Sequence, residues 1–203
     1  MPSPTIQDQA HMKLGRLVHS YQKFEALLKA VVARSNTFGK ADEFEENFRA
    51  FQSATSGQTL GSITNRLFDT IYGPPKEVPE PTNLDKPFFA IEMRTVIKDP
   101  EILNRERRKF QAVVVDRNTL IHSTLASLNL ESETDCQVLI DELDRQHEQL
   151  IPLYEEIRDQ LKEFIQFAQA IAKNPELFDS NAKPPETVVI GDHAYTKDST
   201  NSL

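Results

Sequence analysis

Between Cys136 and Ile171 the apolar residues recur at intervals of four and three, and this spacing constrains the fold more than any other feature of the chain. The series, which includes one histidine, consists of Cys136, Ile140, Leu143, His147, Leu150, Tyr154, Ile157, Leu161, Phe164, Ala168 and Ile171. An α-helix places residues so spaced on one face, as in the seam of a coiled coil. The capping-box pattern at 132–135 should begin this helix, and Asn174-Pro175 should end it. We therefore expect one long helix, kinked but not ended at Pro152, which lies off the seam.

Two earlier segments also have the period of an amphipathic helix. The first is expected to run from about Gln7 to Arg34, with an apolar stripe of Leu14, Val18, Tyr21, Phe24, Leu28, Val31 and Val32. The second begins after Thr59, a suitable N-cap, and is expected to bury Leu60, Ile63, Leu67 and Ile71. Gly73-Pro74-Pro75 should end it. Between the two, the polar connector from Gly39 to Gly57 contains DEFEENFRAF, which could form a short helix.

A further helix has clear start signals. The tripeptide Asp99-Pro100-Glu101 supplies an N-cap, a proline at the first helical position and an acid in the first turn. The period of 3.6 then continues to about Leu128. Before this helix, residues 74–87 are rich in proline and acid and are expected to form an extended surface loop. The segment FFAIEMRTVI, from Phe88, fits either a short helix or an irregular packing segment.

The length of 203 residues is that of one domain, or of one domain with a tail. The chain has no Trp and only 6 Gly, and its apolar residues come at helical rather than alternating spacing. We expect an all-α protein, with an antiparallel four- to five-helix bundle over residues 1–174 and a mostly disordered tail over residues 175–203. The seam of the last helix is longer than a compact bundle requires, which predicts a homodimer interface.

Composition disfavours several classes of protein. No apolar run approaches the ~20 residues needed to cross a bilayer, and the N-terminus lacks the features of a secretory signal, so we expect a cytoplasmic protein without membrane contact. Cys136 is the lone cysteine and is most simply a small core residue. His11, His19 and His193 do not cluster with acids or with the cysteine, so we predict no metal and no cofactor. The net charge of −8 argues against broad nucleic-acid binding; a local contact would use the densest basic cluster, residues 105–109.

The helix that begins at Asp99 carries Arg117, Asn118 and His122 in the order Arg-Asn-x-x-x-His. Asn118 and His122 are four residues apart and therefore share one face of an α-helix. Arg117 lies about 140° from His122 around an ideal helix and points toward the apolar side. Glu25 falls within the apolar stripe of the first helix, where an unpaired charge is costly. We predict that Glu25 and Arg117 meet across the interface between these helices, so that Glu25 supports the motif.

This pattern resembles the HEPN family (higher eukaryotes and prokaryotes nucleotide-binding domains), whose signature is Arg, about four to six residues, then His, often with Asn after the Arg. Glu25 resembles the acidic position that many members have on the first helix, and Thr59-Leu60-Gly61 resembles a motif that opens a middle helix in bacterial members. The resemblance covers roughly residues 12–173. It implies a helical bundle and a metal-independent endoribonuclease, in which the motifs of two protomers form one composite cleft at the dimer interface.

The resemblance also implies roles for individual residues. His122 is expected to act as general base or acid on a ribose 2′-OH or a leaving oxygen. Arg117 is expected to neutralise the scissile phosphate, and Asn118 to orient His122 or to donate to the phosphate. Arg107 and Arg108 are expected to hold flanking RNA. The implied partners are a second copy of the chain, an RNA substrate and a cognate antitoxin or regulatory protein, as in a toxin–antitoxin or phage-defence system.

Other interpretations of the same residues stand beside these. Arg117 could be tied into an internal ion pair instead of contacting phosphate, and residues 105–109 could form a solvated helix face among acidic neighbours. His147, on the seam of the last helix, is expected to be a packed or interface residue. The whole bundle could be a catalytically inactive binding module that acts as an adaptor or regulatory partner, or a helical scaffold without a ligand.

Overall fold

The computed structural model describes residues 3–40, 44–72, 88–92 and 94–173. The elements in chain order are α1 (Ile6–Arg34), β1 (Asn36–Lys40), α2 (Phe44–Ser56), α3 (Leu60–Thr70), β2 (Phe88–Glu92), α4 (Pro100–Thr119), the π-helical turn η2 (Leu120–Thr124), α5 (Leu125–Ser127) and α6 (Glu133–Lys173). The protein is predominantly helical, as its sequence predicts. The predicted loop at 74–87, the stop at Gly73-Pro74-Pro75 and the tail at 175–203 lie outside the described residues.

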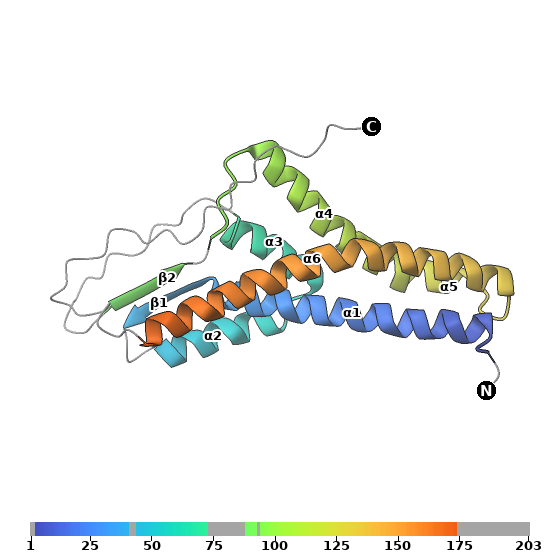
Figure 1. Ribbon diagram of the computed structural model, residues 1–203, viewed down its shortest axis with the longest axis horizontal. Helices are drawn as coiled ribbons and strands as arrows, with labels where there is room; N and C mark the ends of the chain where they lie inside the picture. Colours follow the sequence, from blue (N-terminus) through green and yellow to red (C-terminus); the bar gives the residue numbers. More distant parts are fainter. Residues whose placement is uncertain (1–2, 41–43, 73–87, 93, 174–203) are drawn as a thin grey trace.

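α1 and α6 lie side by side along one direction, and α4 is inclined to them and approaches α6 toward its own C-terminal end (Figure 1). α4 runs opposite to α6, whereas α1 and α6 run the same way and make the most extensive contact between helices (Figure 1). The expected antiparallel arrangement therefore holds between α4 and α6 but not between α1 and α6. None of the described helices combines the length and the apolarity needed to cross a lipid bilayer.

Hydrogen bonds confirm the predicted helix starts. The Thr59 hydroxyl accepts from the backbone N–H of Ser62 at 3.3 Å, and the Asp99 carboxylate accepts from the N–H of Glu101 at 2.8 Å. At the start of α6 only half of the capping box forms. The Ser132 hydroxyl accepts from the Asp135 N–H at 3.3 Å, but the Asp135 carboxylate accepts from Asn129 rather than from Ser132. From there α6 continues as one helix through Pro152.

The described residues also form one small antiparallel sheet, in which Asn36 of β1 lies opposite Glu92 of β2 and Lys40 lies opposite Phe88. Both conformations considered for the start of FFAIEMRTVI are therefore wrong, because Phe88–Glu92 is a strand. A strand is stabilised by a partner that is distant in the sequence, so the local apolar pattern does not reveal it. The short helix considered within DEFEENFRAF does form, as part of α2.

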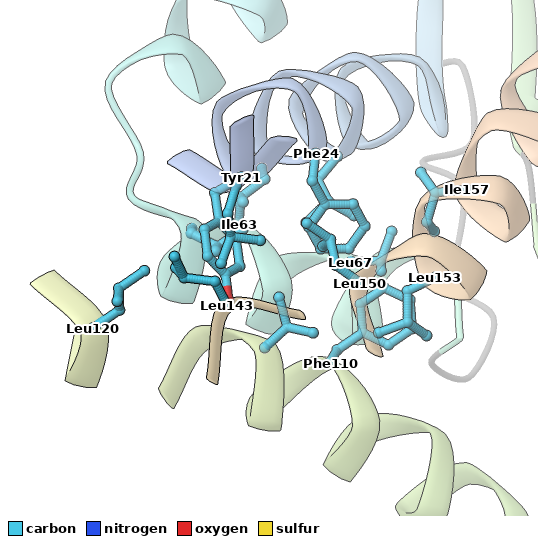
Figure 2. Packing of buried hydrophobic residues seen from close by; sticks show 14 of the residues in the cluster. Tyr21, Phe24, Ile63, Leu67, Phe110, Leu120, Leu143, Leu150, Leu153 and Ile157 are labelled. Carbon is cyan, nitrogen blue, oxygen red and sulfur yellow. The ribbon is translucent and has the colours of Figure 1, made fainter. Parts of the chain in front are cut away.

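The core lies where α1, α3, α4 and α6 meet, and Figure 2 shows side chains from these helices converging there. Phe110 is fully buried; its ring centroid lies 6.0 Å from that of Phe24 and 5.4 Å from that of Phe68, the second pair edge to face. Leu143, Leu150, Leu153 and Ile157 of α6 belong to the same buried cluster. Cys136 is buried as predicted. The core therefore fixes α4 against three other helices.

His147 is exposed, so it is not a packed residue within this chain, and its alternative place at an interface between copies stays a prediction. The neighbouring Gln146 is buried instead, and its side-chain oxygen accepts a hydrogen bond from the Tyr21 hydroxyl at 2.8 Å. An α-helix has 3.6 rather than 3.5 residues per turn, so a strict four–three series drifts around the helix and the buried face moves off it.

Candidate functional site

The Arg-Asn-x-x-x-His motif lies where α4 changes from α-helical to π-helical geometry. α4 ends at Thr119, and in η2 the N–H of Leu125 donates to the C=O of Leu120, five residues earlier. His122 lies in the middle of this turn. A π-helical turn holds more residues than an α-helical one. Such turns are rare in proteins, and those that occur are often found at functional sites. Because each residue in it rotates by less than 100°, Arg117 and His122 are separated by less than the ~140° of an ideal α-helix.

The three motif side chains are accessible to solvent. Asn118 and His122 are exposed, and Arg117 is partly buried, as expected for a residue that leans toward the apolar side. One guanidinium nitrogen of Arg117 donates to the side-chain oxygen of Asn118 at 3.0 Å. Within the part of the chain that the structure describes, the His122 imidazole has neither a hydrogen-bond partner nor an ion-pair partner. The imidazole is therefore open to a ligand, and the guanidinium is bound only to a neutral amide.

Glu25 does not meet Arg117, and this prediction is wrong. Glu25 pairs with Lys29 of the next helical turn at 2.7 Å. The cause is the axial position of the two residues. Phe24 stacks on Phe110, and Arg117 lies seven residues beyond Phe110, which is about 10 Å further along α4. Glu25 is thus a structural residue at the junction with α2, where Lys29 also donates to the Ser56 carbonyl.

The basic cluster at 105–109 is largely committed within the chain. Arg107 lies over the Phe68 ring, 5.2 Å from its centroid, and 3.7 Å from the Asp69 carboxylate. Arg105 and Lys109 both pair with Glu106, at 3.4 and 2.6 Å. Arg108 is exposed and has no ion-pair or hydrogen-bond partner among the described residues. Of the two predicted RNA contacts, Arg108 is therefore available, and Arg107 is held in place.

One exposed face of α4 and η2 connects this free arginine to the motif. Arg108, Gln111, Val115, Asn118 and His122 follow one another at intervals of three and four, and all five are exposed. We call these five residues the α4 face. Val115, the apolar member at its centre, is 60% exposed, and single exposed apolar side chains are common on protein surfaces.

A chain of hydrogen bonds that sequence analysis missed ends at Asp116, the residue before Arg117. The Gln146 amide, which binds Tyr21, donates to Glu142 at 2.7 Å. Glu142 in turn accepts from the Arg145 guanidinium at 2.6 Å, and Arg145 donates to Asp116 at 3.1 Å. Burial raises the pKa of the Tyr21 hydroxyl well above its ordinary value, and the hydrogen bond from Arg145 lowers the pKa of Glu142. The available signal was Tyr21 itself, because a tyrosine in an apolar stripe needs a partner for its hydroxyl.

A second polar junction joins Tyr72, two residues beyond the end of α3, to α6. The Tyr72 hydroxyl donates to the Glu156 carboxylate at 2.8 Å and accepts from the Gln160 amide at 2.8 Å. Burial is the main cause that raises the pKa of Glu156. The Glu106 carboxylate raises it further, and the Tyr72 hydrogen bond and Lys109 act in the opposite direction. Ionised Glu156 is therefore disfavoured in the folded protein.

We expect Glu156→Gln to increase the free energy of unfolding at pH 7 by about 0.5–1 kcal/mol, because the amide oxygen can still accept from Tyr72 without a buried charge. The raised pKa means that the folded state holds the proton more tightly than the unfolded state does. Wild-type stability should thus fall as the pH rises above about 4.5, the ordinary pKa of a glutamate side chain, and the advantage of the variant should disappear below it. Urea denaturation at pH 4 and pH 7 measures this, and an equal difference at both values would contradict it.

No three His, Cys, Asp or Glu side chains among the described residues are close enough to hold a metal ion. Compared with known proteins, the chain matches no family model, no curated protein and no solved structure at a significant level. The resemblance to the HEPN family consequently depends on the residues themselves, above all on Arg117, Asn118 and His122.

Proposed function

We propose that this protein is a metal-independent endoribonuclease of the HEPN type, acting in the cytoplasm as a homodimer. The observation that carries the proposal is the combination of an open imidazole, His122, on a π-helical turn, with a guanidinium, Arg117, one helical turn away on the same helix. Neither is paired with an acid among the described residues. An imidazole can move protons near neutral pH, and a guanidinium matches the geometry of a phosphate.

The proposed reaction uses the ribose of the substrate as the nucleophile. His122 takes the proton of the 2′-OH, and the 2′-oxygen then forms a bond to the adjacent phosphorus. Arg117 neutralises the negative charge that builds up on the phosphate oxygens, and Asn118 holds the Arg117 guanidinium or the phosphate. The bond from phosphorus to the 5′-oxygen breaks, and that oxygen receives a proton from a second imidazole. The products are a 2′,3′-cyclic phosphate and a free 5′-hydroxyl.

The second imidazole would come from another copy of the chain. The α4 face suits such a contact, because exposed Val115 lies between Arg108 and the motif, and Ile121, 38% exposed, comes directly before His122 in the chain. Two copies related by a two-fold axis through this face would bring both motifs together. The proposal includes an HEPN-like bundle over residues 1–174, a kink of α6 at Pro152, and a cognate antitoxin or regulatory partner in a toxin–antitoxin or phage-defence system.

A second candidate function is an inactive binding module that acts as an adaptor. It is favoured by the basic cluster, in which Arg105, Arg107 and Lys109 are all paired with acids and only Arg108 is free among the described residues. A net charge of −8 also weakens attraction to RNA.

The experiment that separates the two is incubation of the full chain with a structured RNA and with DNA of the same sequence, both in the presence of EDTA. The nuclease proposal expects cleavage of the RNA alone, with 2′,3′-cyclic phosphate ends, because DNA lacks the 2′-OH. Size-exclusion chromatography with light scattering would give a dimer. Intact RNA at every protein concentration would overturn the nuclease proposal and favour the binding module, and cleavage of DNA or inhibition by EDTA would exclude this mechanism.

A further inference from the structure

We infer that Arg145 is a positioning residue, which holds Asp116 away from Arg117 and so keeps the Arg117 guanidinium available for a phosphodiester. The inference rests on the proposed function and deepens it, because it states how the phosphate-binding charge is maintained. Arg145 is on α6, and the motif is on α4 and η2, so this control comes from outside the helix that carries the motif.

A carboxylate directly before the motif arginine is a potential competitor for it. Asp116 precedes Arg117 in the chain, and carboxylates bind guanidinium groups with the same geometry as phosphates do. A pair between Asp116 and Arg117 would cancel the charge that a phosphate needs. In the structure Asp116 instead accepts from Arg145 at 3.1 Å, and its side chain is only 19% exposed. Arg117 is left with the neutral Asn118 oxygen at 3.0 Å.

Arg145 is held in this position by its own neighbours. Its Nε and Nη2 atoms donate to the two carboxylate oxygens of Glu142, at 2.8 and 2.6 Å, and Nη1 donates to Gln149 at 3.0 Å. Glu142 also accepts from Gln146, whose oxygen accepts from buried Tyr21. The guanidinium is thus oriented by the packing of α1 on α6. Because it faces two carboxylates, Arg145 is not itself the anion site.

The test measures binding of a short fluorescein-labelled RNA by fluorescence anisotropy at low salt, with His122→Ala as the common parent so that RNA stays intact. We expect Arg145→Gln to weaken binding about tenfold, because the released Asp116 pairs with Arg117 or repels the phosphate. Asp116→Asn should bind at least as tightly as the parent. The double variant Arg145→Gln/Asp116→Asn should recover to within about threefold of the parent, since the competing carboxylate is gone.

Arg158→Gln is the matched control, because it makes the same change of charge on α6 at a partly exposed arginine paired with Glu155 and Asp159. It should leave RNA binding unchanged. The inference is wrong if Arg145→Gln binds as the control does, or if the double variant stays as weak as the single one although circular dichroism shows both folded. Failure of the proposed function has a different outcome: Arg117→Gln would then bind RNA as tightly as the parent.

Discussion

Replacing His122 with alanine should lower the rate constant of RNA cleavage by about 10²–10⁴-fold, which is the usual contribution of general acid–base catalysis. The imidazole does not stabilise the fold through any contact in the described structure, because it is exposed and forms no hydrogen bond or ion pair with a described residue. Its removal should therefore change the chemistry without changing the fold. Single-turnover cleavage of a labelled RNA in EDTA, with enzyme in excess, measures the rate constant separately from product release.

His147→Ala is the control for this prediction, since His147 is likewise an exposed histidine but lies on α6, outside the motif. It should cleave at the wild-type rate, and both variants should unfold within about 0.5 kcal/mol of the wild type. Equal rates for the His122 variant and the wild type would remove the imidazole from the mechanism, whatever nuclease activity the preparation retained.

The features that sequence predicted well are those determined by neighbours along the chain. Thr59 and Asp99 cap their helices with bonds to residues two or three positions away, and the run from Asp99 is helical to Ser127, close to the expected Leu128. Helical periodicity also identified the buried Leu60, Ile63 and Leu67 of α3, though not Thr64 or Phe68, and most of the buried positions of α6. Capping and amphipathicity act within one or two turns, so the residues that cause them are visible in a short stretch.

Contacts between elements were harder to predict, as Glu25 and Arg117 illustrate. Periodicity gives the direction in which a side chain leaves its helix, but it does not give the level at which two helices face each other. Both residues were correctly assigned to stripes that turn inward, yet Phe24 faces Phe110 and so sets Glu25 well short of Arg117. The pairing of β1 with β2 was not predicted at all, since each strand is stabilised by a partner that is distant in the sequence.

For the candidate site, the identity of the residues could be predicted but their surroundings could not. The spacing of Arg117, Asn118 and His122 was visible in the sequence, whereas the π-helical turn was not, because a helical wheel assumes a constant 100° per residue. The link from Arg145 to Asp116 joins residues of two different helices. Its existence depends on the register of α4 against α6, which is set by the core.

Phe110→Ala should lower the free energy of unfolding by about 3–5 kcal/mol, because it leaves a cavity beside the rings of Phe24 and Phe68, which both pack on Phe110. A domain of ordinary stability has about 5–15 kcal/mol in total, so this single change should bring the protein close to unfolding. Because the same core holds α4 in register with α6, RNA cleavage should fall at temperatures where the variant begins to unfold.

Urea denaturation followed by circular dichroism measures the loss caused by Phe110→Ala, and Val115→Ala is its matched control on the same helix. Val115 is 60% exposed, so its truncation should change the free energy of unfolding by less than about 0.5 kcal/mol. If Val115 lies in a dimer interface, its truncation should also weaken the dimer while leaving the isolated fold intact. A Phe110 variant as stable as the Val115 variant would mean that α4 does not pack on α1 and α3 as described, and the register that places Asp116 beside Arg145 would be lost with it.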